Sequence, residues 1–252
     1  MVATLMAHCG ARLVTPGELD LMDAPPPTDT WFPIRHSQVL DTVMGTLDKA
    51  GFGISRVQLA VSADSARFFG TLDLSSPVCE GVNLAVGIRN SVDKSFPIAF
   101  CCGERVFVCD NLAFSSEIVV SKKHTRFGGV RFTEGIARAV VGLRQYQTAA
   151  AERIERFQKA VLSVDQANSV ILQAYERGIL GARVLPRVIH EWRHPCHDEF
   201  RERTAWSLLN CITEVLKERQ RERPAEAAYQ TITLQKLLSE RGESCGVEQA
   251  SA

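Results

Sequence analysis

The feature that most constrains the fold is a succession of β-prone runs between residues 56 and 121, joined by polar, turn-prone segments. Such runs predict antiparallel strands connected by turns. The run at 66–74 partly alternates apolar and polar side chains, as a half-buried strand does. The predicted strands are residues 56–62, 66–74, 82–89, 97–102, 105–109 and 117–121.

Apolar residues at three- and four-residue spacing predict helices on both sides of these runs. Glycines follow the first helix and end it, and Asp165 is the predicted N-cap of the third. The predicted fold is α+β: an antiparallel, sheet-rich N-terminal half packed with a long helix, and a helical C-terminal half. The predicted helices are residues 37–50, 134–162, 165–177 and 197–220.

The length of 252 residues and the hydrophobic content of 45% fit one large domain with short appendages. We expect a single α+β domain over residues 31–220. Residues 1–30 are acidic and contain three consecutive prolines, which predicts an extended arm. Residues 221–252 are expected to form a charged, flexible tail.

Charge and cysteine content limit the environment of the protein. The 29 basic and 29 acidic residues balance, so net charge does not indicate a nucleic-acid partner. No apolar run approaches the roughly 20 residues that span a bilayer, so no membrane partner is expected. The first ten residues make a poor signal peptide, and the eight cysteines therefore indicate reduced thiols in the cytoplasm.

The sharpest chemical motif is HExxH at residues 190–194, the pattern of a helical zinc site in metallopeptidases, with Glu214 as a candidate third ligand. Pro186 and Pro195 limit the helix to about two turns, which weakens this interpretation. Residues 190–197 offer four potential donors, but a turn that enters the next helix explains them better. We therefore assign no metal ligand and no cofactor.

Other catalytic patterns are weaker. Cys109 could be a nucleophile, but a strand end followed by a turn explains residues 109–111 better. No glycine-rich phosphate loop occurs, so nucleotide hydrolysis has no support. No catalytic residue is assigned.

A basic segment at residues 121–132 interleaves four cations with Phe127 and Phe132. Cations neutralise phosphates and exposed aromatic rings stack on bases, although a solvated loop with both rings packed inward is the alternative. A second basic cluster lies at residues 89–94. The candidate phosphate contacts are Arg89, Lys94, Lys122, Lys123, Arg126 and Arg131.

Three ordered segments, at residues 88–95, 106–112 and 204–217, resemble a family of phage and plasmid proteins known as domain of unknown function 932. The resemblance covers roughly residues 30–220, with Lys94 and Cys211 as departures from the family pattern. It implies an origin in mobile genetic elements inside bacterial cells. The family has no settled activity that can be transferred.

The function that these observations favour is nucleic-acid handling, namely single-stranded DNA binding or annealing without catalysis. The predicted order of elements resembles the core of ring-forming recombination annealing proteins, which is compatible with a homo-oligomer. The alternatives are a zinc-dependent hydrolase using residues 190–194 and a non-enzymatic protein that binds a host factor. The favoured function requires that the basic clusters at 89–94 and 121–131 share one surface.

Overall fold

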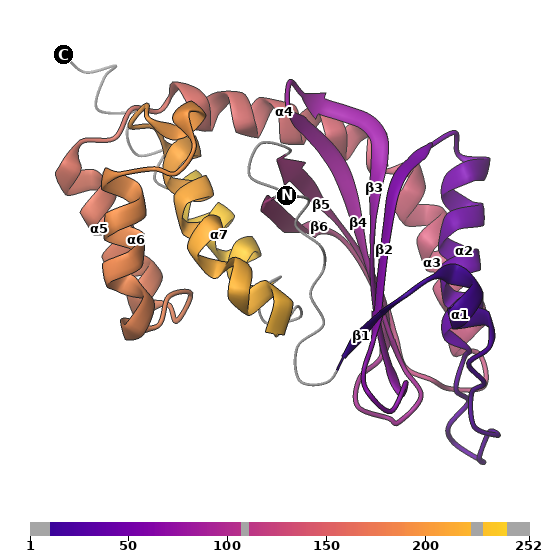
Figure 1. Cartoon of the computed structure of the whole chain (residues 1–252). Coiled ribbons are helices and arrows are strands. Elements are labelled where there is room, and N and C mark those ends of the chain that lie inside the picture. Colours follow the sequence, from indigo (N-terminus) through magenta and orange to yellow (C-terminus); the bar gives the residue numbers. More distant parts are fainter. Residues whose placement is uncertain (1–10, 107–110, 223–228, 241–252) are drawn as a thin grey trace. The chain divides into compact units, whose positions relative to one another are not determined.

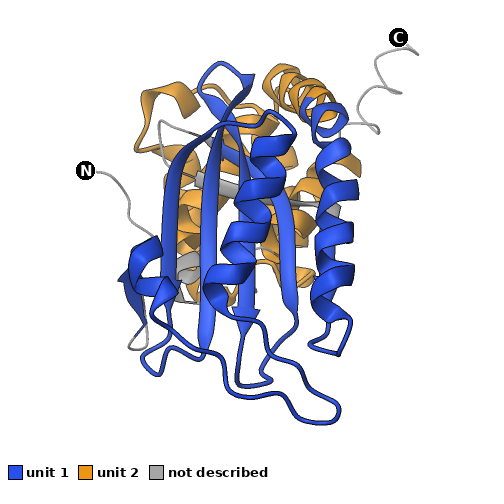
Figure 2. Cartoon of the chain, turned by 90° about the vertical axis from the view of Figure 1, so that its right-hand side faces the viewer, with its two compact units in different colours: residues 1–105, 115–147 blue, residues 106–114, 148–252 orange. Residues whose placement is uncertain are grey.

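A computed structural model describes residues 11–106, 111–222 and 229–240. The chain divides into two compact units (Figure 2). Unit 1 consists of Met1–Arg105 and Ser115–Gln147, and unit 2 of Val106–Phe114 and Thr148–Ala252. The single domain over 31–220 stays a prediction, because a compact unit need not fold independently.

Six strands form one antiparallel sheet in sequential order, β1 to β6, which confirms the predicted α+β class (Figure 1). The expected runs 97–102 and 105–109 belong, as far as they are described, to the single strand β5. The strands are β1 Arg12–Val14, β2 Ile54–Val61, β3 Arg67–Cys79, β4 Val82–Ser91, β5 Ile98–Val106 and β6 Asn111–Lys122.

Residues 11–20 contribute to the core of unit 1, although the sequence predicted an extended arm there. Strand β1 pairs with β2 at the sheet edge, and helix α1 (Pro16–Asp20) follows it directly. Val14 and Leu19 are buried. A three-residue strand leaves too short an apolar pattern in the sequence to be recognised before its partner is known.

Helix α2 (His36–Lys49) confirms the helix predicted at 37–50 and packs on the sheet. Its apolar stripe of Val39, Val43 and Leu47 is buried, and it contacts β4 and helix α3 (Gly128–Val141). Figure 2 shows helices of unit 1 lying over one face of its sheet. Amphipathic helices bury their stripes in this way.

The helix predicted over 134–162 is two helices, α3 and α4 (Leu143–Lys159), which separate at Gly142. Glycine is the least favourable helix residue after proline, so a break is cheapest there. Helix α3 also begins six residues earlier than predicted, at Gly128. A Cβ atom on Gly128 would collide with the Lys123 carbonyl oxygen, so this tight entry requires glycine.

Unit 2 is helical. Helix α5 (Val164–Glu176) begins at a capping box in which the Ser163 hydroxyl accepts from the Gln166 amide, so the N-cap is Ser163 and the prediction of Asp165 was wrong. Of the stretch predicted as one helix over 197–220, the structure gives a 3-10 turn at Asp198–Phe200 and then α7 (Ala205–Glu222). Between α5 and this 3-10 turn, the chain forms the short 3-10 helix η1 (Ala182–Val184) and helix α6 (Leu185–Arg193).

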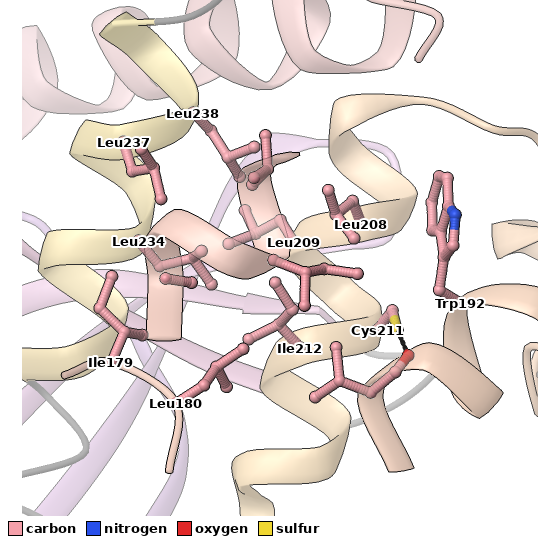
Figure 3. Close-up of a cluster of buried hydrophobic side chains, with 14 of the residues drawn as sticks. Ile179, Leu180, Trp192, Leu208, Leu209, Cys211, Ile212, Leu234, Leu237 and Leu238 are labelled. Atoms are coloured by element: carbon pink, nitrogen blue, oxygen red, sulfur yellow. Dashed lines mark hydrogen bonds between the residues drawn. The ribbon is translucent and has the colours of Figure 1, made fainter. Parts of the chain in front are cut away.

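The expectation of a flexible tail is wrong for residues 229–240, which form a helix. Leu234, Leu237 and Leu238 of this helix are buried in one apolar cluster with Ile179 and Leu209 (Figure 3). Their spacing of three and four residues is the helical signal that the surrounding charges conceal. No helix in the described part of the chain is long and apolar enough to span a bilayer.

Candidate nucleic-acid interface

One end of the unit 1 sheet collects the loops that carry both basic clusters. Antiparallel order places the ends of β2, β4 and β6 beside the starts of β3 and β5, at the lower end of the sheet in Figure 1. The loops at 62–66, 92–97 and 123–127 therefore lie at this end. The two clusters predicted at 89–94 and 121–131 consequently belong to the same end of one sheet.

The segment 31–36 connects the two clusters directly. The Phe32 amide donates to the His124 carbonyl oxygen at 2.9 Å. The Asn90 side-chain amide donates to the Ile34 carbonyl oxygen at 2.8 Å. This segment therefore touches β4 beside the first cluster and the β6–α3 loop inside the second.

The cations of the first cluster contact aromatic rings. The Arg89 guanidinium carbon lies 5.4 Å from the centroid of the Phe96 ring. The Lys94 ammonium lies 5.1 Å from the centroid of the Trp31 ring, on a turn where Lys94 has a φ of 68°. Such contacts orient a cation without neutralising its charge.

Asp93 is the negative group of this region. Partial burial raises the pKa of its carboxyl, but hydrogen bonds from Ser95 and Arg67 outweigh burial and lower the pKa to about 2. The Arg67 Nε atom lies 2.8 Å from the Asp93 carboxylate, so their charges offset each other. Asp93 therefore pairs with Arg67 and not with the neighbouring Lys94, whose positive charge stays available to a ligand.

The cations of the second cluster differ in exposure. Lys122 is half-buried at the end of β6, whereas Lys123, Arg126 and Arg131 are exposed. Phe127 is 59% exposed beside the Arg126 guanidinium, which lies 5.9 Å from its centroid. Phe132, in contrast, is 1% exposed, so of these two rings Phe127 is the one that can stack on a base.

None of the six predicted cations forms an ion pair with a described carboxylate. The ion pairs of unit 1 use other residues, such as Arg35 with Asp23 and Arg105 with Asp73. Positive charge therefore remains available at this end of the sheet, which overall charge balance did not indicate.

A buried polar cluster lies beneath the loops and was not predicted from the sequence. The His36 Nε2 atom lies 3.0 Å from the Ser65 carbonyl oxygen, and its Nδ1 atom lies 2.9 Å from the Asn90 side-chain amide nitrogen. A carbonyl oxygen only accepts, so Nε2 carries the ring proton and Nδ1 accepts from Asn90. Burial lowers the pKa of His36, which favours this neutral form.

His124 completes this cluster. It is 6% exposed, and neither of its ring nitrogens reaches a partner with hydrogen-bond geometry. Burial and the nearby charge of His36 lower the pKa of His124, and the Phe96 backbone raises it by less. Trp31 Nε1, Arg89 Nε and Asn90 Oδ1 are also buried without a hydrogen-bond partner. Isolated histidines give no sequence signal of such a cluster.

The HExxH motif is divided by the end of a helix. His190 lies on α6, but His194 lies beyond its last residue, with φ of −134° and ψ of 71°. The two rings still lie 5.1 Å apart, centroid to centroid. The Glu191 carboxylate accepts a hydrogen bond from the Cys196 amide at 2.8 Å, so this side chain caps the turn after α6. The candidate third ligand, Glu214, groups with Cys196 and His197.

The remaining candidate nucleophile, Cys109, lies outside the described residues. No family model, curated protein or solved structure matches the chain. The resemblance to the phage and plasmid family stays a prediction, and the functional argument depends on the geometry of unit 1.

Proposed function

We propose that the loop end of the unit 1 sheet binds single-stranded nucleic acid through its phosphates. The observation that supports this function is the gathering of six cations, none paired with a described carboxylate, at one end of one sheet. Each phosphate neutralised by such a cation releases condensed counterions, which drives binding. No catalytic group is needed for this activity.

Base stacking provides the second part of the interaction. Phe127 is 59% exposed in the middle of the second cluster, and Arg126 lies against its ring. A base stacked on an exposed aromatic ring contributes about 1–3 kcal/mol, largely independent of sequence. A cation beside a stacking ring suits a single strand, because its unpaired bases can stack on the ring while its phosphates contact the cation.

Single-stranded DNA is the polymer we favour, and strand annealing by a ring of subunits is the finer form of this proposal. The order of elements, a helix, an antiparallel sheet and returning helices, supports that form by analogy alone. An origin in mobile genetic elements would agree with it.

The test is binding of a fluorescent oligothymidylate to the full chain over a series of salt concentrations. If all six cations contact phosphates, the logarithm of the binding constant should fall with the logarithm of salt with a slope of about −4. The triple variant Lys123→Glu, Arg126→Glu, Arg131→Glu should reduce the slope to about −2 or less. These three side chains are exposed, so their reversal should leave the fold intact.

A matched control separates the local effect from net charge. The variant Arg183→Glu, Arg193→Glu, Lys236→Glu changes the charge equally on exposed residues of unit 2. It should keep most of the affinity and the wild-type slope. Absence of binding at low salt, or equal losses in the two triple variants, would refute the proposed function.

A further inference from the structure

We propose that Cys196, His197 and Glu214 in unit 2 form a zinc-binding site. One ligand atom of each residue lies within 4.8 Å of the others, and no other three-residue group of His, Cys, Asp or Glu within the described ranges does so. Two donors come from the loop after α6 and the third from α7. The site would tie this loop to the helix, and it is independent of the function proposed for unit 1.

The histidine donor and the carboxylate donor already face each other. His197 Nε2 lies 3.9 Å from Glu214 Oε2. The His197 ring is held edge-on against Phe200, with centroids 5.9 Å apart and an interplanar angle of 80°. A ring oriented by packing loses little conformational freedom when it binds a metal.

Backbone hydrogen bonds hold the loop that carries Cys196. Its amide donates to the Glu191 carboxylate at 2.8 Å. The Arg203 guanidinium donates to the carbonyl oxygens of Trp192 and Arg193, the latter at 2.9 Å. The path of the chain between α6 and Cys196 is therefore defined by side chains on both sides of the loop.

The chemistry of the three donors selects the ion. A thiolate, an imidazole and a carboxylate are the ligand types of zinc, whereas magnesium and calcium prefer oxygen alone. Zinc–ligand distances of about 2.0–2.3 Å place tetrahedral donors roughly 3.3–3.8 Å apart, so small side-chain rotations would close the site. Binding converts the Cys196 thiol to a thiolate and releases its proton to solvent.

The exposure of the site allows an ion to enter. Cys196 is exposed, and the side chains of His197 and Glu214 are 28% and 24% exposed. Three protein ligands leave a fourth position for water. Lys217 competes for this site, because its ammonium lies 2.5 Å from Glu214 Oε2 and must yield that oxygen or share the carboxylate.

The site differs from the one that HExxH predicts. Zinc in a helical HExxH site would use His190 and His194, whereas the proposed site uses neither. Because His190 and His194 are exposed and adjacent, their joint replacement is a matched control.

The experiment is titration of the chelator-treated, full-length protein with zinc, followed by equilibrium dialysis and metal analysis. We expect one equivalent of zinc, and cobalt in its place should give the absorption bands of a thiolate-bound ion. Cys196→Ser and His197→Gln should each weaken zinc binding at least about tenfold. His190→Gln with His194→Gln should leave it unchanged.

Circular dichroism establishes that each variant is folded. A loss of zinc binding can then be attributed to the replaced ligand. Wild-type protein that binds less than about one tenth of an equivalent at micromolar zinc would overturn the proposal. So would zinc binding that survives Cys196→Ser but is lost when His190 and His194 are replaced. Neither result depends on nucleic-acid binding by unit 1.

Discussion

Replacing Arg105 by methionine removes the closest partner of a buried carboxylate in unit 1. Asp73 on β3 and Arg105 on β5 have side chains that are 2% and 5% exposed, and Arg105 Nε lies 2.7 Å from Asp73 Oδ1. The other cation near this carboxylate, Arg56, is 3.9 Å away and 27% exposed. Among the described residues, Arg105→Met therefore leaves this buried carboxylate with one nearby cation, at 3.9 Å.

The expected cost follows from these distances. Opposite charges 4 Å apart at an effective dielectric constant of about 20 attract by about 4 kcal/mol. Removal of one member of a buried pair costs about 3–5 kcal/mol, because the remaining charge stays desolvated. We expect Arg105→Met to lower the free energy of unfolding by this amount. The double variant with Asp73→Leu should recover about 2 kcal/mol or more, since both charges are then gone.

Urea unfolding followed by far-ultraviolet circular dichroism measures these free energies for the wild type, both single variants and the double variant. The control is Arg201→Met, which breaks an ion pair with Asp198 whose side chains are 73% and 81% exposed. Such surface pairs contribute little, so this variant should match the wild type. A loss below about 1 kcal/mol for Arg105→Met, or purely additive single effects, would refute the reasoning.

Two further predictions concern a helix cap and a buried ring. Ser163→Ala should lower the free energy of unfolding by about 1 kcal/mol because it removes the capping box of α5. Asp165→Ala should cost clearly less. Equal losses in urea titrations of the two variants would contradict the cap assignment. Burial lowers the pKa of His36 below its ordinary value of 6.5, so the unfolded chain binds more protons than the folded one at acidic pH. Stability should therefore be fully present above pH 6.5 and fall as the pH is lowered towards the folded pKa, and His36→Gln should flatten this profile; an unchanged slope in the variant would contradict it.

The two proposed sites place different chemistry in the two units. Unit 1 carries the six cations that pair with no described carboxylate and the exposed Phe127, which suit a polyanion. Unit 2 carries the sulfur, nitrogen and oxygen donors, which suit a metal ion. Each can be tested with variants that leave the other unchanged.

Local sequence patterns predicted most elements because side-chain periodicity reports which face of an element is buried. As far as they are described, the β-prone runs became strands, and the stripe at 37–50 became α2. The break at Gly142 was less evident, since apolar spacing continues across it from α3 into α4. Residues 229–240 were assigned to a flexible tail because their charged surroundings dominate the composition of that region.

The candidate sites were predicted only in part. The two basic clusters are visible as composition, but Trp31, His36 and His124 carry no signal of their own. Cys196 and His197 are neighbours in the chain, so their pairing was foreseeable. Their grouping with Glu214 on α7 also depends on how the loop folds back.

By itself, the sequence determined the order and type of most elements, because these depend on local spacing of apolar residues and on turn-forming residues. It also determined which segments are basic. Only the tertiary structure decided that these segments meet, because the contacts joining them are between distant residues, as when Asn90 binds the Ile34 carbonyl oxygen 56 positions away. Hydrogen bonds of this kind depend on the path of the folded backbone, which no local pattern encodes.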